Sequence, residues 1–134
     1  MHRMIPDLQA ALLCEDVRIE ASGSNTLVGV LHAIATPVLP VRIMKLCVFT
    51  RWCSGLGEFS QTTRILSEDE NTELGKTVTP FKLKDSDNQA TNVAVFGGLE
   101  FTSAGDYPIE ISLNGDLKMR FNLRVVQIEK TPHH

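Results

Sequence analysis

The stretch FTSAGDYPIEISLNGDLKMRFNLRV, residues 101 to 125, contains two runs in which apolar and polar residues alternate. Alternation with a period of two is typical of β-strands that bury one face. Asn114-Gly115 separates the two runs, and this dipeptide accepts the positive φ angles of a tight hairpin turn. The stretch therefore predicts an antiparallel hairpin. Its second strand is expected to turn these residues inward: Leu117, Met119, Phe121, Leu123 and Val125.

Tyr107 is the single tyrosine of the chain and stands at the start of the first of these strands, two residues after Gly105. This position matches the tyrosine corner of immunoglobulin-like sandwiches, in which the hydroxyl bonds a nearby backbone group. Trp52, on an earlier apolar run, resembles the buried tryptophan of strand C in the same folds. We interpret both aromatic residues as structural.

The rest of the chain shows strand signals and almost no helical periodicity. The expected strands cover residues 8–14, 17–20, 26–34, 41–53, 59–66, 74–83 and 91–101, besides the hairpin. Pro80 predicts an edge position for its strand, because proline cannot donate to a ladder. Short strands at spacings of about ten residues predict an immunoglobulin-like antiparallel β-sandwich of about 7–9 strands, with a small β-barrel as the alternative. We expect one domain over residues 1–129, followed by a polar tail over residues 130–134.

Composition and charge narrow the classes of function. The 134 residues are 43% hydrophobic and 22% charged, which is typical of one globular domain. The net charge of −3 argues against a nucleic-acid partner, whose phosphates attract clustered cations. Asp7 and Gln9 interrupt the N-terminal apolar run, so we expect no export signal and no membrane association. A cytoplasmic protein is the simplest interpretation.

Several segments spread over most of the chain resemble a family of short uncharacterised bacterial proteins, a domain of unknown function. These segments are Met4–Gln9, Leu13–Val17, Asn25–Val30, Thr50–Cys53, Thr91-Asn92 and Phe96–Gly98. The resemblance implies a bacterial, cytoplasmic β-sandwich. It implies no catalytic residue.

Cys14, Cys47 and Cys53 are the three cysteines, and His32 is the one histidine away from the chain ends. The cysteines form no Cys-x-x-Cys pair, whereas structural zinc sites usually contain closely spaced ligand pairs. A cysteine nucleophile needs a histidine within hydrogen-bond reach, and no recognised nucleophile motif surrounds any of these residues. We expect three reduced thiols, with Cys53 the most exposed, and no metal, cofactor or catalytic residue. The alternative is a small-ligand or metal-binding protein, or an enzyme that uses a Cys/His site.

The best candidate interaction surface lies outside the core. Lys45, Phe49 and Arg51 alternate with the inward residues of their strand. If that strand shares a sheet with the last two, this face also contains Lys118, Arg120 and Arg124. Cationic groups beside an exposed aromatic ring can contact an acidic partner, although an ordinary solvated face is the alternative.

These observations predict a non-catalytic protein–protein interaction or assembly module. The first expected strand, residues 8–14, has no charge and no proline, so leaving its edge unpaired in water is hazardous. We therefore expect a homodimer that buries either this N-terminal segment or the face around Phe49.

Overall fold

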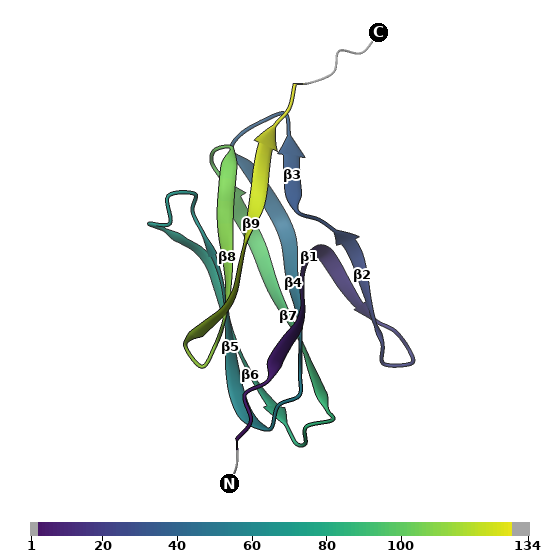
Figure 1. Ribbon diagram of the computed structural model, residues 1–134. Coiled ribbons are helices and arrows are strands. Elements are labelled where there is room, and N and C mark those ends of the chain that lie inside the picture. Colours follow the sequence, from purple (N-terminus) through teal and green to yellow (C-terminus); the bar gives the residue numbers. More distant parts are fainter. Residues whose placement is uncertain (1–2, 130–134) are drawn as a thin grey trace.

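The computed structural model describes residues 3–129, which form nine β-strands in two facing sheets (Figure 1). The strands are β1 (Asp7–Ile19), β2 (Asn25–Val30), β3 (Ala33–Thr36), β4 (Val41–Cys53), β5 (Gly57–Leu66), β6 (Glu73–Leu83), β7 (Gln89–Phe101), β8 (Gly105–Leu113) and β9 (Asp116–Gln127). No helix occurs in residues 3–129, so the prediction of an all-β chain is confirmed. The predicted tail, residues 130–134, lies outside the described residues.

The four-stranded sheet has the order β2-β1-β4-β7, and the five-stranded sheet has the order β3-β9-β8-β5-β6. All pairings are antiparallel except that β3 lies parallel to β9. β4 and β7 of the first sheet thus face β5, β8 and β9 of the second across the core. β6, which contains Pro80, is an edge strand as predicted.

Tyr107 closes one end of the core. Its side chain is 2% exposed, and its hydroxyl donates a 2.6 Å hydrogen bond to the carbonyl oxygen of Ser103. The ring of Phe101 packs against it edge to face at 4.8 Å between centroids. The chain therefore makes the contact that defines a tyrosine corner, as the sequence predicts.

A buried glutamine joins the two sheets. The side-chain oxygen of Gln61, on β5, accepts hydrogen bonds from Thr50 at 2.8 Å, Trp52 at 2.8 Å and Asn92 at 2.9 Å. These donors lie on β4 and β7, in the opposite sheet. The amide nitrogen of Gln61 donates to Thr63 at 2.9 Å. The carboxamide is therefore satisfied inside the core, where an unpaired polar group is costly.

Trp52 is fully buried and stacks on Phe81 at 5.9 Å between ring centroids. It lies on β4, however, which belongs to a different sheet from the strand that contains Tyr107. Strand C of an immunoglobulin sandwich shares a sheet with the tyrosine-corner strand. The comparison of Trp52 with the strand C tryptophan is therefore wrong, although its burial is as predicted.

The predicted strand over residues 26–34 is wrong, because the chain changes sheets within it. β2 ends at Val30 in the four-stranded sheet, and β3 begins at Ala33 in the five-stranded sheet. Between them, the Leu31 amide still donates to the Leu13 carbonyl of β1, whereas the His32 carbonyl accepts from the Arg124 amide of β9. Residues 31 and 32 thus cross from one layer to the other.

Two further expectations about the strands are wrong. Residues 8–14 and 17–20 belong to the single strand β1, which pairs with both β2 and β4, so the N-terminal segment is not a free edge. This correction removes the unpaired edge of the N-terminal segment as a dimer surface, but not the outer face of β1. In β9, Leu123 and Val125 are buried, but Leu117 and Met119 are 54% and 37% exposed. They lie next to the β8–β9 turn, where Asn114 and Gly115 have positive φ angles as predicted.

We predict that Gln61→Leu lowers the free energy of unfolding by about 2–4 kcal/mol, because three buried donors lose their acceptor. Urea denaturation followed by circular dichroism measures this change. Thr62→Val is the matched control, since Thr62 is the next residue along β5 and points to the other face. We expect the control to change the unfolding free energy by less than about 0.5 kcal/mol. Equal effects of the two substitutions would show that the network contributes nothing specific.

Candidate functional site

The outer face of the four-stranded sheet is largely apolar. Along β4, Cys47 and Phe49 alternate with the core residues Leu46 and Val48 and point away from the second sheet. Their register partners on the neighbouring strands are also apolar. We call this surface the apolar band; its members are Leu12, Cys14, Val30, Cys47, Phe49, Val93 and Val95.

Three members of the apolar band are open to solvent. Leu12 is 41% exposed, Val30 56% and Val95 52%, and they come from β1, β2 and β7. None of the three belongs to the core cluster between the sheets. Packing between the two sheets therefore does not explain why apolar residues occupy these three positions.

Phe49 is 7% exposed, so the expectation of an exposed aromatic ring is wrong. Leu12 and Val93 are its register partners on either side, and the guanidinium carbon of Arg51 lies 5.8 Å from the ring centroid. A central strand has neighbours on both sides, and these side chains enclose the ring. Phe49 is therefore the floor of the apolar band rather than its exposed surface.

An ion pair limits the apolar band at one end. Lys45 on β4 donates to the carboxylate of Asp16 on β1 at 2.7 Å. This hydrogen bond lowers the pKa of the Asp16 carboxyl group and raises the pKa of the Lys45 ammonium group. Arg51, toward the other end, donates to the hydroxyl of Thr91 at 3.2 Å. The charged groups around the band are thus already engaged with neighbours.

The predicted six-residue cationic face is wrong, because the strands that supply it lie in different sheets. Lys45, Phe49 and Arg51 belong to the four-stranded sheet. Lys118, Arg120 and Arg124 lie on β9, in the five-stranded sheet. Alternation along a strand does not determine which sheet the strand joins.

The outer face of the five-stranded sheet carries ion pairs instead. Arg120 pairs with Glu110 at 3.2 Å and also contacts Glu70. Arg64 reaches the same Glu110 at 3.0 Å. Arg124 pairs with Asp106 at 3.1 Å. Two of the three predicted cations on this strand are thus neutralised within the chain, and the face is an ordinary solvated surface.

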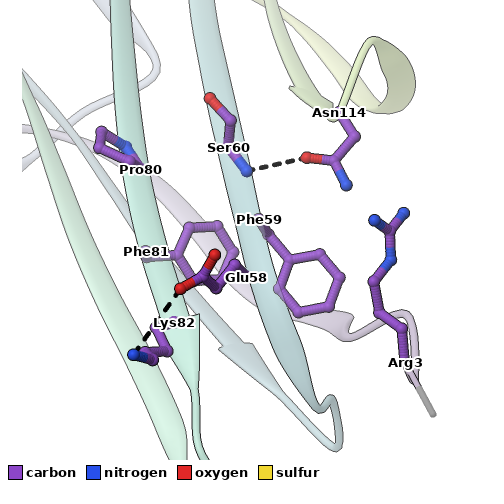
Figure 2. A pocket seen from close by; sticks show the side chains of 8 residues that line it. All are labelled: Arg3, Glu58, Phe59, Ser60, Pro80, Phe81, Lys82 and Asn114. Atoms are coloured by element: carbon purple, nitrogen blue, oxygen red, sulfur yellow. Dashed lines mark hydrogen bonds and ion pairs between the residues drawn. The ribbon is translucent and has the colours of Figure 1, made fainter. Parts of the chain in front are cut away.

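An open hollow lies at one end of β5 and β6 (Figure 2). The Arg3 guanidinium stands over the Phe59 ring at 5.5 Å from its centroid. Asn114 lies on the same side of β5 as Arg3 in Figure 2, and its side-chain oxygen accepts the Ser60 amide at 2.9 Å. The Asn114 amide also donates to the Ser60 carbonyl, so the turn residue extends the ladder. In a small-molecule site, polar groups converge on one point. The groups around this hollow do not converge, and each has a structural role.

The cysteines and His32 do not form a common site. Cys14 and Cys47 are register partners on β1 and β4 and are fully buried, whereas Cys53 is half-buried. Burial raises the pKa of both buried thiols, and their proximity raises the pKa of Cys14 further. His32 is exposed and lines a shallow pocket with Asp106, Asn122 and Arg124. Among residues 3–129, no three His, Cys, Asp or Glu side chains are grouped as metal ligands.

A protein-family profile described as a family of unknown function, DUF6941, matches residues 9–126. The chain belongs to this family. No curated protein matches the chain. The matched residues include the whole apolar band and the buried network around Gln61, so both lie within the family domain. The part of the DUF6941 chain that the structure describes contains no helix long and apolar enough to span a membrane.

We predict that iodoacetamide at pH 7 modifies Cys53 about tenfold or more faster than Cys14 and Cys47, because buried thiols with a raised pKa hold little thiolate. Mass spectrometry of peptides over a time course measures the three rates. In urea, all three thiols should react at similar rates, which serves as the control. Rapid reaction of Cys14 or Cys47 in the folded protein would instead support an enzyme with an activated cysteine.

Proposed function

We propose that this DUF6941 protein is a non-catalytic protein-interaction module that docks through the apolar band. The contrast between the two outer faces carries this proposal. One outer face has neutralised ion pairs such as Arg120–Glu110 and Arg124–Asp106. That face also exposes Val78, on the edge strand β6, whereas on the other face Leu12, Val30 and Val95 come from three strands and surround a buried apolar floor of Cys14, Cys47 and Phe49.

The free-energy cost of exposing apolar side chains to water supports docking at this face. Apolar surface left in water costs about 25 cal/mol per Å², and contiguous exposed apolar patches usually mark contact sites. Phe49 and the two cysteines beneath the exposed side chains provide a firm base, because they are almost fully buried in the single chain. The surface is therefore pre-formed, and a partner orders few side chains when it binds.

The proposal also covers the lack of catalytic activity, the cellular location and the description of the fold. A buried Cys14–Cys47 pair with raised pKa values argues against a cysteine nucleophile, so a binding role is favoured over an enzyme. Three free cysteines favour a cytoplasmic location, in keeping with the bacterial resemblance of the sequence. The tyrosine corner favours the immunoglobulin-like description of the sandwich.

We predict that a photo-crosslinking benzoylphenylalanine in place of Val95 forms a protein adduct in the native cell. The same probe at Val78 is the matched control, because Val78 is 57% exposed and lies on β6, an edge strand of the other sheet. Gel electrophoresis and mass spectrometry detect the adducts, including adducts between copies of this chain.

A second substitution tests whether the adduct depends on the apolar band. Leu12→Asp, introduced with the probe at Val95, should reduce the adduct at least about tenfold, since a charge at the contact is strongly unfavourable. Val78→Asp should leave it unchanged. Absence of an adduct from Val95, or equal adducts from both probe positions, would refute docking at this face.

A further inference from the structure

We propose that the partner of the apolar band is a second copy of this chain, bound face to face. The two-fold axis lies in the interface, parallel to the strands and midway between β1 and β4. This inference rests on the proposed docking function and names its partner. A two-fold interface brings one patch against its own copy, so the order of residues across the face determines which side chains meet.

One row of residues across the sheet is symmetric about the proposed axis. The register places Val30, Cys14, Cys47 and Val95 side by side on β2, β1, β4 and β7. This row has a small thiol on each side of the proposed axis and an exposed valine beyond each thiol. Rotation about the axis places Val30 opposite Val95 of the second copy, while the fully buried cysteines lie beneath the centre of the interface. Valine thus meets valine on both sides of the axis.

Opposite charges also face each other under this rotation. Asp16 lies on β1 and Lys45 on β4, on the two sides of the same axis, and they are joined at 2.7 Å. Their side chains are 41% and 51% exposed, so both can also reach a group above the sheet. The rotation places Asp16 opposite Lys45 of the second copy, and Lys45 opposite Asp16 of the second copy. Four charges then alternate in sign, which favours this arrangement over one that slides along the strands.

Side chains at the other end of the apolar band are also complementary in size under the rotation. Arg51 on β4 has Ala10 as its register partner on β1. The rotation therefore places this long cation over the alanine of the second copy and keeps the two arginines apart. Leu12 likewise faces Phe49 of the second copy. Large side chains meet small or flat ones, and no like charges are brought together.

A charge-exchange experiment tests the inference. We expect the wild-type chain to have twice its 14.8 kDa mass at about 100 µM in light scattering. Asp16→Lys places only positive charges, and Lys45→Asp only negative charges, at the centre of the interface. Each variant alone should dimerise at least about tenfold more weakly than wild type. An equimolar mixture should restore the dimer as a mixed pair, because every position again faces its opposite.

Arg42→Glu is the matched control. Arg42 pairs with Glu100 at 3.4 Å across β4 and β7, away from the apolar band, so its charge reversal should leave the dimer intact. Thermal unfolding by circular dichroism checks that each variant is folded, and Leu12→Asp supplies an independent variant that should also be monomeric. Single variants that remain dimeric, or a mixture that remains monomeric, would overturn the inference.

The outcomes separate this inference from the docking function. A monomeric wild-type chain whose Val95 probe captures a different protein refutes the second copy and leaves docking in place. A monomeric chain without any adduct refutes both.

Discussion

Gln61 holds the two sheets in one arrangement, because its side-chain oxygen accepts hydrogen bonds from Thr50, Trp52 and Asn92 on the opposite sheet. Apolar contacts are non-directional and tolerate sliding, whereas a buried acceptor with three donors permits one relative position. A shift of β4 by one residue would turn Thr50 and Trp52 outward and remove two of the three donors to the carboxamide oxygen. The polar network therefore specifies the alignment that the surrounding apolar contacts stabilise.

The fixed orientation of β4 determines which of its residues point into the core and which point outward. When Trp52 and Val48 point into the core, Cys47 and Phe49 must point outward, since side chains alternate along a strand. Because β4 lies between β1 and β7, Cys47 and Phe49 are flanked on both sides and are buried although no second layer covers them. The apolar band is thus a consequence of the same alignment that forms the core.

Local signals in the sequence were sufficient for the hairpin around Asn114-Gly115 and for the tyrosine corner at Tyr107. Sheet membership was not predictable in this way, because the alternation of β4 is the same whichever sheet it joins. The change of sheet at residues 31 and 32 also depends on pairing with the distant strand β9. The role of Gln61 was missed, although one signal was present: it shares parity with the apolar residues Phe59 and Ile65, which marks a polar residue at a core position. Its donors come from other strands, so sequence alone could not identify them.

The parallel pairing of β3 with β9 has a consequence for the order in which this fold can form. Ala33 pairs with Arg124, and the ribosome makes β3 long before it makes β9. Translation adds about 5–20 residues per second, so β3 waits several seconds for its neighbour. Contacts between residues so far apart in sequence also slow folding. The nascent chain therefore cannot complete its five-stranded sheet until synthesis is almost finished.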